Sequence, residues 1–144
     1  MTQDGWTGTI AGAPQRGAAA ERTRTTSMRD VEMFTEMTGD RNPLHYDEVA
    51  AQRSRVGRLV VQGGVTTGLL NAVVAEDLPG PGTVFLETSW RFVRAVGIGE
   101  TITAKVEVAE VRTDKPICRL ETTVVNEQGE VCVEGTAVTY TMAL

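Results

Sequence analysis

The pattern of hydrophobic and polar positions divides this chain into a helical first half and a second half of strands. In residues 101–109 every second residue is apolar, a period of two that predicts a strand with one buried face. Residues 84–92 alternate in the same way, so we expect their even positions to face the core. Residues 117–125 and 131–141 predict two further strands, joined by a hairpin turn that ends with Gly129.

Helical signals lie before these strands. Ser27 and Asp30 have the spacing of a capping box, which marks the first turn of a helix. The apolar residues that follow at helical spacing are Val31, Phe34 and Met37. We expect this helix to end at Gly39. Residues 46–54 predict a further short helix, which Asp47 would cap.

A central helix is predicted over residues 63–76, which are apolar on nearly every side, as in a helix surrounded by protein. Pro79 ends it, and residues 21–27 predict a polar edge strand near the start of the chain. One buried helix followed by a long antiparallel meander predicts an α+β fold, in which the sheet wraps around the helix. We expect an irregular arm at residues 1–16 and a single domain at residues 17–144.

The length and charge of the chain narrow the classes of function. A chain of 144 residues fits one domain that buries a core without disulfides or metals. The net charge of -5 argues against nucleic acid and membrane partners, because both favour a basic surface. No apolar run approaches transmembrane length, and the start of the chain lacks the apolar segment of a secretory signal. We therefore expect a cytoplasmic protein.

The cysteine and histidine content indicates that no metal is needed. Cys118 and Cys132 are the two cysteines, and they do not form a C-x-x-C pair, so we interpret them as reduced thiols of the core. His45 is the single histidine, which leaves no cluster of metal ligands.

His45 belongs to the segment GDRNPLH, residues 39–45, which also contains an acid, Asp40. A spacing of five residues fits neither a helix nor a strand, so the segment must be a loop if the two side chains are to meet. Pro43 stiffens this loop, because a proline disfavours the α conformation at the residue before it, Asn42. Stiff loops are suited to positioning chemical groups.

The longer motif FTEMTGDRNPLHYD resembles the hydratase motif of MaoC-like proteins, specifically the (R)-specific enoyl-CoA hydratases. The similarity covers about residues 17–142, and the segments LPGPG, FVRAVGIGE and VRTDKPI follow in the order of that family. The resemblance implies a hot-dog fold, a long central helix wrapped by an antiparallel sheet. It also implies a hydro-lyase that reversibly converts trans-2-enoyl-CoA to (R)-3-hydroxyacyl-CoA, with the CoA thioester as substrate and no cofactor.

The chemistry of hydration assigns work to the same loop. Adding water to a 2-enoyl thioester needs a base for the water, a proton donor for C2 and donors for the thioester oxygen. Asp40 and His45 can hold one water between them and supply the first two. The resemblance gives the water proton to Asp40, with His45 orienting the water or relaying the proton. The residues alone leave the two assignments open.

A backbone N–H at the start of the central helix can donate to the thioester oxygen, and Gly63 is the residue expected there. Helix N-termini carry unpaired N–H donors, and a glycine lets the thioester approach the backbone closely. In the family this turn usually reads His-Gly, whereas here it reads Gln62-Gly63-Gly64, and Asn71 stands where the hydratases often carry Ser. Gln62 cannot titrate, so it cannot replace a histidine as acid or base. These departures are either tolerated variation or a change in pocket shape. The expected substrate-pocket residues are Asn42, Gln62, Gly64 and Asn71.

Rival functions share this fold. A dehydratase of 3-hydroxyacyl groups on a carrier protein or in a specialised pathway would use the same loop, because CoA and carriers share the phosphopantetheine arm. Thioester hydrolysis fits the motif less well, and a non-catalytic assembly module is the third reading. Arg53, Arg55 and Arg58 are either CoA phosphate ligands or a solvated basic face. The sheet edges favour a homodimer or a dimer-based oligomer. Trp90 and Phe92 are predicted in the core or a subunit interface.

Overall fold

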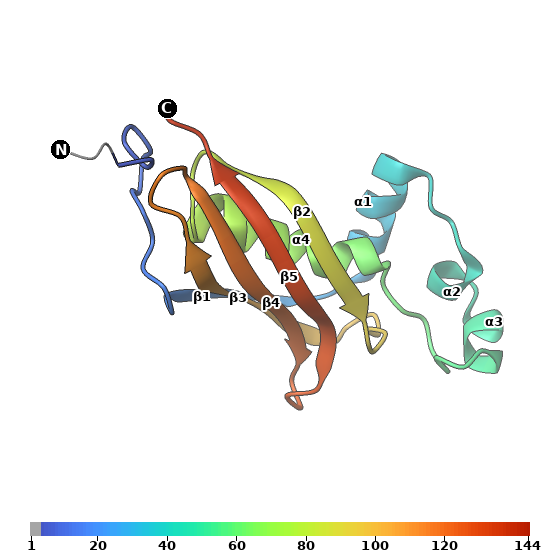
Figure 1. The fold of residues 1–144 in the computed structure, drawn as a ribbon. Coiled ribbons are helices and arrows are strands. Elements are labelled where there is room, and N and C mark those ends of the chain that lie inside the picture. The colour runs from blue at the N-terminus through green and yellow to red at the C-terminus, as the bar shows by residue number, and fades with distance from the viewer. Residues whose placement is uncertain (1–3) are drawn as a thin grey trace.

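The computed structural model describes residues 4–144, which form one antiparallel sheet curved around a helix (Figure 1). The strands are β1 (Ala19–Thr25), β2 (Thr83–Phe92), β3 (Thr101–Val111), β4 (Ile117–Asn126) and β5 (Val131–Thr141). Their spatial order is β1-β3-β4-β5-β2. The predicted α+β layout is confirmed. The predicted meander holds only for β3, β4 and β5, because β2 pairs with β5 at one edge instead of with β3.

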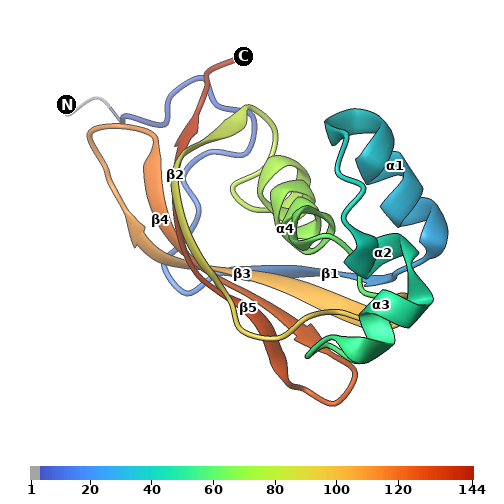
Figure 2. The same cartoon turned by 90° about the vertical axis from the view of Figure 1, so that its right-hand side faces the viewer.

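The helices occupy the concave side and one end of the sheet (Figure 2). They are α1 (Met28–Thr38), α2 (Pro43–Tyr46), α3 (Glu48–Arg53) and α4 (Gly63–Ala72), and α4 continues into the π-helical turn η1 (Val73–Asp77). Leu70 and Val73 of the central helix pack in one apolar cluster with Ile102 and Leu120 of the sheet. None of the helices among residues 4–144 is long and apolar enough to cross a membrane.

The alternation of apolar residues holds in β3, where Ile102, Ala104, Val106 and Val108 are all buried as expected. In β2 it fails near the start of the strand. A β-bulge shifts the register between Phe85 and Glu87, and such an extra residue reverses which side chains face the core. Phe85 therefore packs edge-on against Trp90, while Val84 and Leu86 are exposed.

The predicted caps are confirmed. Ser27 and Asp30 form a capping box at the start of α1, and Gly39 ends the helix with a φ of 83°. Asp47 caps α3 by accepting a hydrogen bond from the N–H of Ala50 at 3.0 Å. The expected apolar stripe of α1 is only partly right, because Met37 is 74% exposed. Its buried face is formed by Asp30, Val31 and Thr35.

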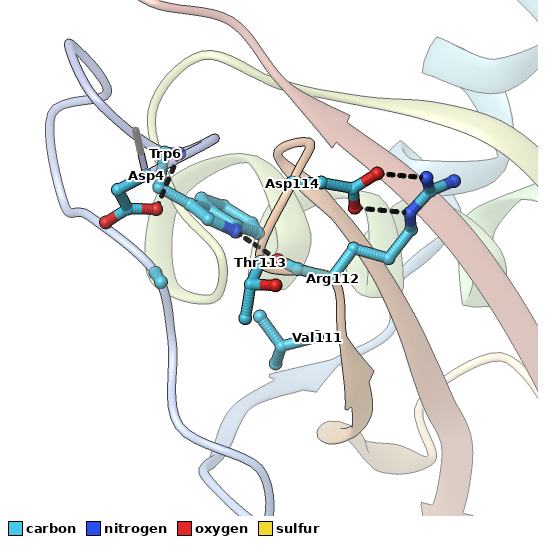
Figure 3. A pocket seen from close by; sticks show the side chains of 7 residues that line it. Asp4, Trp6, Val111, Arg112, Thr113 and Asp114 are labelled. Carbon is cyan, nitrogen blue, oxygen red and sulfur yellow. Dashed lines mark hydrogen bonds and ion pairs between the residues drawn. The ribbon is translucent and has the colours of Figure 1, made fainter. Parts of the chain in front are cut away.

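The irregular arm packs onto the fold through Trp6 (Figure 3). The indole N–H of Trp6 donates to the carbonyl of Arg112 at 2.8 Å, and the ring borders a surface cavity of about 440 Å³. Residues 1–3 of the predicted arm lie outside the described residues. The predicted boundary after residue 16 is not tested by these contacts and stays a prediction. Cys118 and Cys132 are unpaired and buried in the core, as expected.

Candidate active site

The segment that carries Asp40 and His45 begins as a loop and ends as a single helical turn. Gly39 reverses the chain after α1, and the side chain of Asn42 accepts the N–H of Leu44 at 3.1 Å. Asn42 therefore caps α2, and Pro43 occupies the first turn, where its missing N–H costs nothing. The prediction that the whole GDRNPLH segment is a loop was wrong for its second half, since His45 lies on this short helix.

The imidazole of His45 is held by the backbone of the segment before α4. Its Nδ1 atom lies 2.6 Å from the carbonyl oxygen of Val60. A carbonyl oxygen only accepts, so Nδ1 must carry the hydrogen. In the neutral ring, Nε2 is then an acceptor, and it faces Asp40. The side chain is only 9% exposed, which limits its freedom to turn.

Asp40 presents one free carboxylate oxygen to this nitrogen. Its Oδ1 atom accepts the N–H of Asn42 at 3.0 Å, while Oδ2 lies 3.9 Å from Nε2 of His45. That separation is too long for a direct hydrogen bond, and both atoms are acceptors when His45 is neutral. Two facing acceptors are suited to the two hydrogens of one water molecule. The structure therefore brings Asp40 and His45 together, as predicted, at a separation that leaves room for one shared water molecule.

A cavity of about 330 Å³ lies at the start of α4. Its wall includes Val61, Gly63, Thr66, Phe92, Val96 and Val133. Among residues 4–144, no protein acceptor receives the N–H groups of Gly63 and Gly64, as is typical of a first helical turn. Gly63 is thus placed on the wall of a cavity with a free donor, three residues after the carbonyl that orients His45.

The other predicted pocket residues do not line this cavity. Gln62 is buried, and its Nε2 atom donates to the carbonyl of Val31 at 3.1 Å. A β-carbon on Gly64 would lie 2.3 Å from the ring of Phe34, so a side chain here would meet α1. Asn71 is exposed on α4. The pocket roles of Asn42, Gln62, Gly64 and Asn71 stay predictions.

Three contributors to the site were missed in the sequence. Thr35 and Tyr46 form a hydrogen-bonded pair behind the GDRNPLH segment, and the Val60 carbonyl orients His45. The threonine could have been noticed as a polar residue at helical spacing from Val31. The role of Val60 has no sequence signal, because every residue carries a carbonyl.

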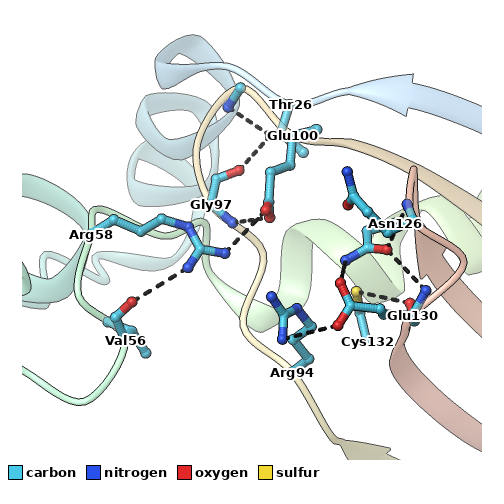
Figure 4. Close-up of polar contacts among 11 residues, drawn as sticks. Thr26, Val56, Arg58, Arg94, Gly97, Glu100, Asn126, Glu130 and Cys132 are labelled. Atoms are coloured by element: carbon cyan, nitrogen blue, oxygen red, sulfur yellow. Dashed lines mark hydrogen bonds and ion pairs between the residues drawn. The ribbon is translucent and has the colours of Figure 1, made fainter.

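Charged side chains near the cavity are paired with one another (Figure 4). Arg94, which lines the cavity, lies 3.3 Å from Glu130, and Arg58 lies 3.1 Å from Glu100. Burial, followed by the nearby charge of Glu100, raises the pKa of the Cys132 thiol. Arg53 and Arg55 are exposed, so a role in binding CoA phosphates stays a prediction. In the part of the chain that the structure describes, no three His, Cys, Asp or Glu side chains gather as a metal site.

Comparisons with known proteins agree with this geometry. The MaoC like domain family matches residues 9–130. A 3-hydroxybutyryl-CoA dehydratase of Methylorubrum extorquens is 40% identical over 111 residues, which are 77% of this chain and 70% of that protein. An (R)-specific enoyl-CoA hydratase of Aeromonas caviae is 34% identical over 122 residues, 85% of this chain and 91% of its own.

The fold is also found among solved structures. An (R)-hydratase from A. caviae involved in PHA biosynthesis superimposes with a TM-score of 0.85 at 32% identity. The superposition covers 90% of this chain and 98% of the hydratase. This similarity confirms the hot-dog fold that the motif implied.

Proposed function

The chain belongs to the MaoC-like domain family of hydro-lyases, and from that premise we propose that it reversibly hydrates trans-2-enoyl-CoA to (R)-3-hydroxyacyl-CoA. The observation that carries the proposal is the pair of facing acceptors, Oδ2 of Asp40 and Nε2 of His45, at 3.9 Å. The R configuration rests on similarity to a relative named as (R)-specific.

The reaction begins with one water held between the two acceptors. Its oxygen bonds to C3 of the enoyl group, and Asp40 takes one of its hydrogens through Oδ2, which has no protein donor among residues 4–144. His45 accepts the other hydrogen and so orients the attacking lone pair. The proton on Asp40 is then transferred to C2, which completes the addition and restores the carboxylate.

The thioester oxygen gains negative charge as the water adds. The N–H of Gly63, at the positive end of the α4 dipole, supports that charge. A glycine allows the close approach, and we place the acyl group in the cavity that Gly63 lines, although Asp40 and His45 are not part of its wall. The reaction is acid–base chemistry, so the proposal includes the CoA thioester as substrate and no metal or redox cofactor.

Crotonyl-CoA tests the proposal directly. Hydration removes the ultraviolet absorbance of the conjugated enoyl thioester without releasing free thiol. Release of thiol would show thioester hydrolysis instead, and no change in either signal would favour a non-catalytic module. Asp40→Asn is the control for catalysis by this site. Comparing kcat/KM for the same acyl group on CoA and on a carrier protein separates the carrier-dependent dehydratase alternative.

We also infer that two copies of the chain pair. The edge strand β2 exposes Val84 and Leu86, of which Leu86 is 56% exposed, and unpaired edges of this kind favour association. Light scattering of the wild type should give the mass of a dimer or a multiple of it. A dilute, active monomer would contradict this inference.

A further inference from the structure

Thr35 lies behind the GDRNPLH segment, where its hydroxyl contacts the backbone of Asp40 and the side chains of Tyr46 and Gln62. It is on α1, which Figure 2 shows beside α2 and α4, and only 6% of it is exposed. Its hydroxyl oxygen has three polar neighbours: the carbonyl of Asp40 at 2.7 Å, the hydroxyl of Tyr46, and Nε2 of Gln62 at 3.4 Å.

The hydrogens of this group can be assigned. A threonine hydroxyl has one hydrogen and two lone pairs. The hydrogen must go to the carbonyl of Asp40, because a carbonyl only accepts. Tyr46 and Gln62 must then both donate to Thr35, which uses its full hydrogen-bonding capacity. The amide of Gln62 is fixed in the same orientation because its Nε2 also donates to the carbonyl of Val31.

The three partners of Thr35 are Asp40 itself and the residues next in sequence to His45 and Gly63, the other two groups of the proposed mechanism. The peptide of Asp40 is held on both sides, since its N–H donates to the hydroxyl of Thr38 at 3.1 Å and its carbonyl accepts from Thr35. Tyr46 follows His45 on α2. Gln62 precedes Gly63 at the start of α4. One buried hydroxyl thus contacts the backbone of Asp40 and the side chains that are next in sequence to His45 and Gly63.

We propose that Thr35 is a positioning residue, whose hydroxyl fixes Asp40, His45 and Gly63 relative to one another. This inference rests on the proposed hydration of enoyl thioesters. Thr35 touches no reacting atom. Its removal should change the geometry of the site, and small displacements of catalytic groups lower turnover by up to about 10²-fold.

The test compares two substitutions of Thr35. Thr35→Val keeps the shape and removes the hydroxyl, and it should lower kcat on crotonyl-CoA by about 10- to 100-fold while KM changes by less than about threefold. Thr35→Ser restores the hydroxyl and should return kcat to within about threefold of the wild type. The matched control is Thr83→Val, which removes a buried threonine hydroxyl bonded to Thr141 at 2.8 Å on the sheet edge, outside the site. It should leave kcat unchanged.

A second measurement does not depend on activity. His45 is the only histidine, so the protein has a single set of imidazole NMR signals. Thr35→Val should shift these signals, whereas Thr35→Ser and Thr83→Val should not. If the wild type fails to hydrate any enoyl thioester, the proposed function is wrong, and this spectrum still decides the role of Thr35.

Several outcomes would overturn the inference. A folded Thr35→Val protein with wild-type kcat and unchanged His45 signals would show that the hydroxyl does not position the site. Equal losses in Thr35→Val and Thr35→Ser would assign the effect to packing. If Thr35→Val does not fold, Tyr46→Phe removes only the phenolic donor, and a wild-type kcat and His45 spectrum in that variant would exclude the network.

Discussion

Nε2 of His45 lies 3.9 Å from Oδ2 of Asp40, and each atom is a hydrogen-bond acceptor when the imidazole is neutral. The neutral tautomer is set by the Val60 carbonyl, which binds the hydrogen on Nδ1. One water can donate to both atoms, whereas a protonated imidazole would attract the carboxylate directly. This geometry is the basis of the proposal that the two side chains act as one unit on a single water.

Substituting either member of this pair should remove most of the activity without unfolding the protein. Asp40→Asn keeps the shape and removes the base, and His45→Gln keeps a hydrogen-bonding group and removes the imidazole. Each should lower kcat on crotonyl-CoA by about 10² to 10⁴. Because groups that act as a unit are strongly non-additive, the double variant should be scarcely slower than the poorer single variant. Steady-state kinetics measure these effects, and thermal melts confirm folding.

Near-wild-type turnover in either folded variant would remove that residue from the mechanism. If the two losses multiply in the double variant, Asp40 and His45 act in separate steps, and the shared water must be abandoned.

Gly64 provides a test of packing between α1 and α4. A β-carbon at Gly64 would lie 2.3 Å from two ring atoms of Phe34, whereas one at Gly68 of the same helix meets nothing within 4 Å. Gly64→Ala should therefore destabilise the fold by about 1 to 3 kcal/mol. Gly68→Ala should stabilise it by about 0.5 to 1 kcal/mol, because alanine has less entropy to lose.

Thermal or urea unfolding of the two variants gives the comparison. Adding Phe34→Leu, which shortens the ring side chain, should recover much of the stability lost in Gly64→Ala. If Gly64→Ala is as stable as Gly68→Ala, the ring of Phe34 moves aside without cost. That result would favour the alternative that Gly64 shapes the substrate pocket. The chain-length preference of Gly64→Ala would then decide that role.

The fold was predictable where the sequence pattern and the packing have the same period. In β3, apolar residues at every second position are all buried, from Ile102 to Val108. In β2 the bulge between Phe85 and Glu87 changes which side chains face the core, and no residue type in this segment predicts a bulge. In α1, Asp30 and Thr35 are buried although they are polar, because each has hydrogen-bond partners that only the folded chain supplies.

The features of the candidate site likewise divide into those that the sequence pattern predicts and those that only the fold reveals. The proximity of Asp40 and His45 could be predicted because acid, proline and histidine lie within one short motif. The free N–H of Gly63 could be predicted from the unpaired donors of helix N-termini, and the catalytic roles of all three residues stay predictions. The Val60 carbonyl and the hydroxyl network of Thr35 could not be predicted, because they come from segments that only the fold brings together. The position of β2 beside β5 was missed for a related reason, since strand order is a long-range property.

The thiol of Cys118 should be inert in the native protein. Burial raises its pKa from 9.0 to about 11, so almost no thiolate exists near neutral pH. Because the folded pKa lies above the unfolded value, this group contributes stability below pH 9.0 that is lost as the pH rises toward about 11.

Labelling with Ellman's reagent tests this prediction. At pH 8 the reagent should react slowly with the thiol in buffer and rapidly in denaturant. Cys118→Ala should show a shallower loss of melting temperature over that alkaline range. Rapid labelling of the native thiol would contradict this burial.

The ion pair between Arg24 and Asp30 should make the protein sensitive to acid. Hydrogen bonds from Arg24, then its charge and the N–H of Ser27, hold the pKa of the Asp30 carboxyl below its usual 3.8 against the opposing effect of burial. Asp30 is 5% exposed and closes the capping box of α1, so its negative charge supports both the pair and the helix. A depressed folded pKa contributes stability above the unfolded value, which is lost as the pH falls through the folded one.

Asp30→Asn should therefore lower the free energy of unfolding at pH 7 by about 1 to 2 kcal/mol, a figure reduced because Arg24 is half exposed. The difference from the wild type should begin to shrink as the pH falls below about 4, where the carboxyl of the unfolded wild type takes up a proton, and it is lost as the pH falls through the lower folded pKa. Asp77→Asn is the matched control, since Asp77 pairs with Arg22 through the same two guanidinium nitrogens at 2.7 and 3.1 Å. The pair of Arg22 and Asp77 is exposed and does not cap the start of a helix. Its loss should therefore lower the free energy of unfolding by less than about 1 kcal/mol, and added salt should make this effect smaller.

Urea unfolding from pH 3 to 7 measures the stability of both variants. Equal losses in the two, or a difference between Asp30→Asn and wild type that stays constant as the pH falls from 7 to 3, would show that the charge of Asp30 does not stabilise the start of α1.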